Sequence, residues 1–193
     1  VYDMLVECVS VVEMPTKYGD FKAHCYINKL NGEHHVALVM GELNSGNDVL
    51  CRVHSECLTG DVFGSLRCDC GQQLDRAMKM IAENGSGVLL YMRQEGRGIG
   101  LVNKLKAYHL QDKGMDTLDA NLALGFQGDL REYYIGAQIL RDLGIKSLHL
   151  LTNNPDKVYQ LEDYGMQISS RVPIEIKANP YDSFYLKTKK DRM

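Results

Sequence analysis

Short hydrophobic segments separated by polar turns make up the first third of the chain, a pattern that is typical of β-strands. β-Branched and aromatic residues occupy many of the apolar positions, and turn signals rich in Gly, Asn and Asp separate the segments. Strands are therefore predicted at residues 5–14, 20–27, 34–43 and 49–55. Together these segments indicate an antiparallel, β-rich first third.

The period changes to the helical one after Gly71. The apolar residues of the next segment share one helix face and are Leu74, Ala77, Met78, Ile81 and Ala82. Downstream, predicted strands alternate with predicted helices, the strands at 87–92, 147–152 and 166–173 and the helices at 100–112, 132–143 and 155–164. The predicted fold class is α+β, in one domain over residues 1–193 with residues 185–193 as a mobile tail.

Composition and charge exclude several classes of protein. The net charge of −3 offers no basic field for a nucleic-acid backbone or an anionic membrane. Apolar runs of about five residues are far shorter than the roughly 20 residues of a membrane-spanning helix. No signal peptide precedes the first predicted strand, so a cytoplasmic protein is expected. The chain begins with Val1 rather than Met, which fits a fragment of a longer protein.

Three of the six cysteines lie close together in the sequence, as Cys57, Cys68 and Cys70 in a C-x10-C-x-C spacing. A chain of this size, with few cysteines and no secretory signal, favours a metal over disulfides. Three thiolates leave the fourth position of zinc to water, as in a catalytic site. The alternatives are a structural zinc site completed by His54 or Cys51, and simple buried thiols.

The remaining cysteines, Cys8, Cys25 and Cys51, lie within strand patterns and are predicted to be small core residues. His54 and Glu56 match the first half of the zinc deaminase signature, whose second half, P-C-x-x-C, is missing. A nucleoside deaminase is therefore disfavoured. Attack of a zinc-activated water on a carbon of a heterocycle is retained as a hypothesis.

A glycine-rich turn, "RQEGRGIG" at residues 93–100, lies between a predicted strand and a predicted helix. Glycines there let backbone N–H groups approach an anion, and Arg97 adds a guanidinium that can bind a phosphate. The turn matches neither a P-loop nor a dinucleotide-binding fingerprint. Thr152 and Lys157 follow the end of a predicted strand, where α/β sheets place ligand groups, although this segment also fits an ordinary helix start.

Four motifs in this order resemble the GTP cyclohydrolase II family: "RVHSECLTGDVFGSLRCDCG", "RQEGRGIGLVNKLKAYHLQDKGMDT", "LGFQGDLR" and "LLTNNPDK". The resemblance covers residues 49–173. It implies hydrolysis of GTP with Zn²⁺ and Mg²⁺, opening the guanine imidazole ring at the start of riboflavin synthesis. The implied products are formate, diphosphate and 2,5-diamino-6-hydroxy-4-(5-phosphoribosylamino)pyrimidine.

The resemblance also implies roles for particular residues. Cys57, Cys68 and Cys70 match the zinc ligands, and Tyr108 matches a tyrosine that is tied to completion of ring opening. The positions that match GTP-binding residues are Arg52, Val53, His54, Ser55, Glu56, Gln73, Glu95, Gly96, Arg97, Thr117, Thr152 and Lys157. Members of the family are commonly homodimers. Many are fused to a domain that makes 3,4-dihydroxy-2-butanone 4-phosphate.

Asp129 and Arg131 match the family's proton acceptor and nucleophile, but the chemistry leaves the role of Arg131 open. From the residues alone, both lie beside turn glycines and also fit a helix start with a solvated arginine. A guanidinium has a pKa above about 12, which makes it a poor nucleophile. Arg131 therefore either attacks the α-phosphorus of GTP covalently or clamps the triphosphate and stabilises the leaving diphosphate.

Two further functions remain as alternatives to the hydrolase. The first is a paralogue that opens the ring but keeps formate or diphosphate on its product. The second is a zinc-stapled nucleotide-binding module without turnover, against which the complete set of matched catalytic positions argues.

Overall fold

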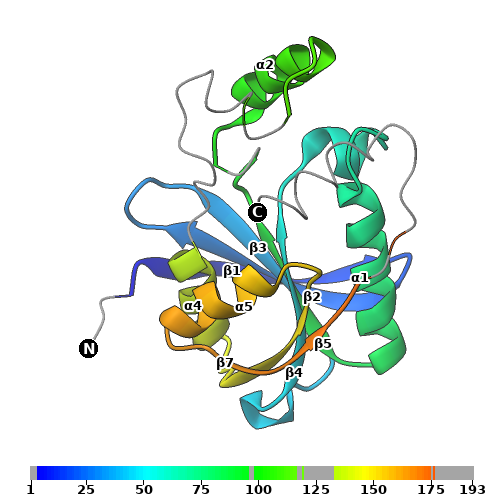
Figure 1. Ribbon diagram of the computed structural model, residues 1–193. Helices are drawn as coiled ribbons and strands as arrows, with labels where there is room; N and C mark the ends of the chain where they lie inside the picture. Colours follow the sequence, from blue (N-terminus) through cyan, green and yellow to red (C-terminus); the bar gives the residue numbers. More distant parts are fainter. Residues whose placement is uncertain (1–3, 96–97, 117–118, 120–132, 175, 177–193) are drawn as a thin grey trace. The chain divides into compact units, whose positions relative to one another are not determined.

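The computed structural model describes residues 4–95, 98–116, 119, 133–174 and 176 (Figure 1). The predicted tail at residues 185–193 lies outside the described residues. Within the described part of the chain, no helix is both long enough and apolar enough to span a membrane.

A single seven-stranded sheet has the order β1-β2-β3-β5-β4-β6-β7. Its strands are β1 (Val6–Thr16), β2 (Gly19–Asn28), β3 (His34–Met40), β4 (Val49–Ser55), β5 (Gly87–Met92), β6 (Ser147–Leu151) and β7 (Gln167–Val172). Pairing is antiparallel from β1 through β2 and β3 to β5, and parallel from β4 through β6 to β7. Together with the helices, this arrangement confirms the predicted α+β class.

The fourth predicted strand departs from the antiparallel expectation. β4 pairs in parallel with β6, with Val49 opposite Leu148 and Cys51 opposite Leu150. Parallel neighbours require a long crossover, and the chain between these two strands supplies one. The central strands β5 and β6 are almost continuously apolar because both of their faces are buried.

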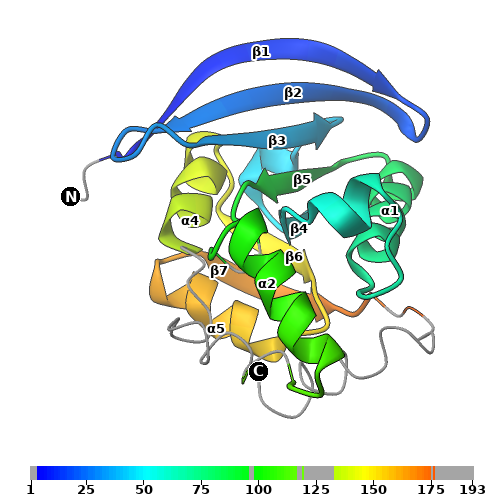
Figure 2. The ribbon, with the colours of Figure 1, turned by 90° about the horizontal axis from the view of Figure 1, so that it is seen from above.

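The helices are α1 (Cys70–Asn84), α2 (Leu101–Asp112), α4 (Tyr133–Asp142) and α5 (Pro155–Asp163). Figure 2 shows α1 on one side of the central strands, with α4 and α5 on the other. Gly136 of α4 packs directly on the side chains of Leu90 and Met92. The predicted start of α5 is confirmed, since the side chain of Asn154 accepts a hydrogen bond from the Asp156 N–H at 3.0 Å.

The predicted core cysteines differ in their burial. Cys51 on the central strand β4 is fully buried, as expected. Cys8 and Cys25 are only half-buried, because they lie on β1 and β2 at the edge of the sheet. All six cysteines are described, and none forms a disulfide.

The described residues fall into two compact units. The first unit contains the sheet, most of α1, and helices α4 and α5. The second unit contains the segment that carries Cys57, Cys68 and Cys70, together with α2. Within the described ranges, the first unit covers 4–54, 75–93 and 133–174, and the second covers 55–74, 94–95, 98–116, 119 and 176.

Candidate metal centre and nucleotide-binding residues

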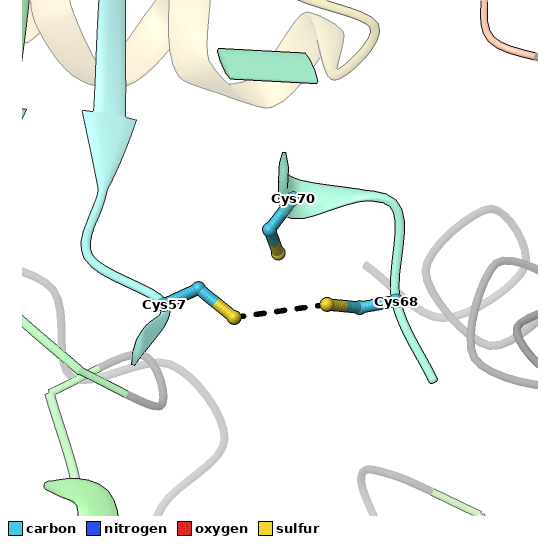
Figure 3. Close-up of side chains that lie close together, drawn as sticks. All are labelled: Cys57, Cys68 and Cys70. Carbon is cyan, nitrogen blue, oxygen red and sulfur yellow. Dashed lines mark hydrogen bonds between the residues drawn. The ribbon is translucent and has the colours of Figure 1, made fainter. Parts of the chain in front are cut away.

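The three clustered cysteines come from a short segment that folds back on itself. Cys57 caps a π-helical turn, η2 (Leu58–Val62), Cys68 lies in the following loop, and Cys70 is the first residue of α1. Figure 3 shows the three thiols turned toward one another. The Sγ atoms of Cys57 and Cys68 are 3.6 Å apart, and all three sulfurs lie within 4.8 Å of one another.

These sulfur positions fit a tetrahedral zinc ion. Zn–S bonds of about 2.3 Å place tetrahedral thiolate ligands about 3.8 Å apart, close to the observed separation. Three soft thiolates are also the donor set that selects zinc over magnesium or calcium. The fold brings the three predicted thiols together, and their sulfur atoms could hold one metal ion.

Two glycines allow the chain to close around the sulfurs. A Cβ atom at Gly60 would lie 3.0 Å from Cys68 Sγ and 3.1 Å from Cys57 Sγ. The Gly60 N–H also donates a hydrogen bond to Cys57 Sγ at 3.4 Å. A Cβ atom at Gly71 would lie 2.2 Å from the Gly60 carbonyl oxygen. Side chains at these two positions would therefore compete with the metal-binding geometry.

A buried ion pair adjoins the thiol cluster. Lys104 Nζ donates to Cys57 Sγ at 2.8 Å and to Glu95 Oε1 at 2.6 Å, and both charged side chains are buried. The Leu58 N–H donates to the second oxygen of Glu95 at 2.8 Å. Glu95, a predicted GTP-binding residue, is thus attached to the same turn that carries Cys57.

The protons of the three thiols are distributed unevenly. Hydrogen bonds from Cys68 and Cys70 hold the pKa of Cys57 well below its usual range, and the Lys104 ammonium adds to this effect against the opposing effect of burial. The hydrogen bond to Cys57 raises the pKa of Cys68 to about 11, with burial acting in the same direction. The pKa of Cys70 is raised for the same reasons. Among the three thiols, Cys57 is therefore the one whose surroundings most favour the thiolate form.

Tyr108, the predicted ring-opening residue, lies on α2, and two cations approach its ring. The Arg67 guanidinium lies 4.3 Å from the ring centroid and Lys104 Nζ lies 5.7 Å from it. Arg67 also donates to the Tyr108 carbonyl at 3.1 Å and to Asp112 Oδ1 at 2.9 Å. Burial raises the pKa of Tyr108 above its usual value although Lys104 opposes the shift, so the hydroxyl keeps its proton.

The first unit gathers a second group of predicted residues at the carboxyl ends of β4 and β6. Arg52 donates to the Leu151 carbonyl at 3.1 Å, and Lys157 Nζ donates to the Val53 carbonyl at 3.2 Å. The side chain of Thr152 accepts a hydrogen bond from the Asn154 N–H at 3.0 Å. The members of this group are buried, and they are Arg52, Val53, His54, Thr152 and Lys157.

The other predicted site residues are distributed as follows. Ser55 and Glu56 are half-buried at and after the end of β4. Gln73 is buried in the first turns of α1 and donates to Asp69 Oδ2 at 2.8 Å. The residues that lie outside the described part of the chain are Gly96, Arg97, Thr117, Asp129 and Arg131.

Three residues near the thiol cluster were missed by the sequence analysis. These are Lys104, Arg67 and Asp61, whose carboxylate accepts a hydrogen bond from the Cys57 N–H at 3.1 Å. Lys104 had a detectable signal, because it precedes Tyr108 by four residues and so shares its helix face. Arg67 and Asp61 had none, since charged residues between the predicted strands and helices are usually solvated.

Comparison with known proteins identifies the class to which this site and fold belong. A sequence profile of the GTP cyclohydrolase II family matches residues 7–173. The chain belongs to this family, and the prediction of an enzyme of this type is confirmed at the level of the family.

Two relatives are both named riboflavin biosynthesis protein RibBA. The protein from Bacillus subtilis (strain 168) is 58% identical over 190 residues, which cover 98% of this chain and 48% of that protein. The protein from Aquifex aeolicus (strain VF5) is 56% identical over 192 residues, which cover 99% of this chain and 47% of that protein. The chain therefore spans about half the length of these relatives.

A solved structure is similar in fold. It is that of RibBX, a two-domain 3,4-dihydroxy-2-butanone 4-phosphate synthase from A. baumannii, with a TM-score of 0.50 and 22% identity. The match covers 88% of this chain and 41% of that one. At this level of identity the similarity concerns the fold alone.

Proposed function

We propose that this chain hydrolyses GTP as a GTP cyclohydrolase II in riboflavin biosynthesis. The reaction opens the guanine imidazole ring at C8. It releases formate and diphosphate and leaves 2,5-diamino-6-hydroxy-4-(5-phosphoribosylamino)pyrimidine. The observation that carries the proposal is the cluster of three thiols, close to Lys104 and Tyr108, in a chain of this family.

Cys57, Cys68 and Cys70 would hold one zinc ion per chain. When bound, zinc lowers the pKa of a water molecule, which makes attack on the weakly electrophilic C8 feasible near neutral pH. The Tyr108 hydroxyl keeps its proton and can donate it to an imidazole nitrogen of the guanine. Glu56 can accept hydrogen bonds from guanine N–H groups.

The triphosphate of GTP requires cationic partners and carries Mg²⁺. Arg52 and Lys157 supply buried positive charge in the first unit, which supports their assignment to GTP binding. The remaining assignments, including Gly96, Arg97 and Thr117, are supported by the family motifs. Asp129 acts as proton acceptor in this proposal, and Arg131 either attacks the α-phosphorus or clamps the phosphates.

The wider setting of the enzyme is also part of the proposal. Reduced thiols function in a reducing compartment, which supports a cytoplasmic location. The half-length match to the RibBA relatives supports a fusion to a butanone-phosphate synthase domain in the full-length protein. A homodimer is expected from the family alone.

Incubation of the protein with GTP and Mg²⁺, followed by mass spectrometry, tests the proposed reaction. The expected products are formate, diphosphate and the pyrimidine. A product that retains the formyl group or the diphosphate would show the paralogous activity, and absence of turnover would show a binding module. ATP is the control, since a site that hydrogen-bonds the guanine edge should reject adenine by several powers of ten.

A further inference from the structure

The three-thiolate donor set presents an electrostatic difficulty for a metal that must activate water. Three thiolates bring three negative charges to a doubly charged cation, and the density they donate weakens its Lewis acidity. A hydrogen-bond donor on one of the sulfurs withdraws part of that density. It also fixes the orientation of the ligand.

Lys104 occupies the position of such a donor. Its Nζ lies 2.8 Å from Cys57 Sγ, so the ammonium contacts a metal-ligand sulfur directly. The side chain is buried, which strengthens the interaction because water does not compete for the sulfur.

Glu95 holds the ammonium against the sulfur. One carboxylate oxygen accepts from Lys104 Nζ at 2.6 Å, and the other accepts from the Leu58 N–H at 2.8 Å. Because Leu58 follows Cys57 in the chain, these contacts form a closed ring of Cys57, Lys104, Glu95 and Leu58. Both ends of the lysine–glutamate pair are therefore tied to the segment that carries the metal ligand.

We propose that Lys104 is a positioning residue of the metal centre. Its ammonium donates to the Cys57 sulfur, orients that ligand and withdraws charge from it, while Glu95 keeps the ammonium in place. This inference rests on the proposed zinc site. It adds a residue to that site which the cysteine pattern does not reveal.

An ordinary buried ion pair is the competing explanation. In that case Lys104 and Glu95 stabilise the fold, and the contact with Cys57 has no effect on the metal. The two explanations differ in what happens to metal binding when the lysine is replaced in a protein that remains folded.

The test measures metal binding without GTP. Zinc affinity is obtained by competition with a chromophoric chelator, and the sulfur-to-metal charge-transfer band is recorded with Co²⁺. Lys104→Met is expected to bind zinc about 10- to 100-fold more weakly. Its Co²⁺ band should move to longer wavelength, because a sulfur without the donor releases electron density more readily.

Two further variants show whether the effect depends on a charged donor at position 104 or only on a positive charge somewhere on this helix. Lys104→Arg retains a charged donor and should recover most of the affinity and the original band. Lys106→Met removes an exposed lysine from the same helix and should change neither quantity. Unchanged affinity and an unchanged Co²⁺ spectrum in folded Lys104→Met would overturn the proposal.

A measurement on the unaltered protein covers the case in which Lys104→Met does not fold. With ¹⁵N-labelled lysine, loading with Cd²⁺ should shift the Nζ signal of Lys104 more than that of any other lysine. A Lys104 signal that does not respond to the metal would contradict the proposal. Because none of these measurements uses GTP, failure here is distinguishable from failure of the proposed reaction.

Discussion

At the scale of single residues, the cluster of three thiols is closely packed. Each thiol lies close to the other two, and Gly60 fits against them only because it has no side chain. The first-unit residues Arg52 and Lys157 bind backbone carbonyls and are therefore already held in place before any ligand arrives. Substitutions of the clustered cysteines and of Gly60 test whether metal binding can be lost while the protein still folds.

Cys68→Ser should lose zinc and GTP turnover while it keeps a cooperative unfolding transition. The reason is that a catalytic metal serves the reaction, whereas the sheet and its helices supply the stability. Metal analysis and urea unfolding measure the two effects, and Cys25→Ser on β2 is the matched control. Unfolding of the domain on metal removal, or a fourth protein ligand detected by spectroscopy, would show a structural zinc site instead.

Gly60→Ala should weaken metal binding by about 10- to 100-fold, because overpacking of this kind costs about 1–3 kcal/mol. The added Cβ would lie 3.0 Å from one sulfur and 3.1 Å from another. Gly136→Ala is the control, since its Cβ would make an ordinary contact of 3.5 Å with Leu90. Equal zinc affinities for the two variants would mean that the loop relaxes around the methyl group.

Tyr108→Phe should impair ring opening more than the release of diphosphate. Loss of the hydroxyl removes a protonated donor but leaves the aromatic ring next to Arg67 and Lys104. Formate release is therefore expected to slow, or a formylated intermediate to accumulate, in a quenched time course. An unchanged rate and yield of formate would assign Tyr108 to packing alone.

At the scale of elements, the local periods of the sequence predicted most helices and strands correctly. The start of α1 was placed too late, because its apolar face begins at Leu74 while the helix begins at Cys70. The first turn of α1 contributes Cys70 to the thiol cluster, so its residues do not show the apolar spacing of a helix that packs on the core. The pairing of β4 with β6 was not predictable, since it joins distant segments that no local period relates.

The junction between β3 and the end of β5 predicts a pH dependence of stability. His35 is buried, and its Nδ1 accepts a hydrogen bond from the Arg93 N–H at 3.0 Å. Burial lowers the pKa of His35 to about 4, so the folded protein keeps this imidazole neutral where the unfolded chain protonates it. Stability from this residue is therefore full above about pH 6.5 and falls as the pH decreases toward 4.

Urea unfolding at pH 7.5 and pH 4.5 measures this effect. His35→Gln should lose less stability between these pH values than the unaltered protein, by at most about 3 kcal/mol. The neighbouring His34 is exposed, so His34→Gln should behave like the unaltered protein. The same pH dependence in both variants would contradict a neutral, buried His35.

At the scale of the whole molecule, the candidate site was predictable only in part. The cysteine spacing identified the three thiols, because closely spaced cysteines are typical of metal ligands. Lys104 shares a helix face with Tyr108, but its contact with Cys57, 47 residues away in the sequence, could not be predicted, because a lysine on a helix is usually solvated. Functional residues that are unusual in type, such as clustered cysteines, can thus be predicted from the sequence. A residue of ordinary type in an unusual environment, such as a buried lysine, can be recognised only in the folded structure.

The central claim is that this chain opens the guanine ring of GTP with a metal held by three cysteines. Its most direct test follows GTP labelled with ¹³C at C8, by NMR, with the zinc-loaded protein, the metal-free protein and Cys68→Ser. The label is expected to appear as formate only with the zinc-loaded protein, and readdition of zinc is expected to restore the reaction to the metal-free protein but not to Cys68→Ser. Label that stays in the intact ring with the zinc-loaded protein, or formate produced equally well by Cys68→Ser, would contradict it.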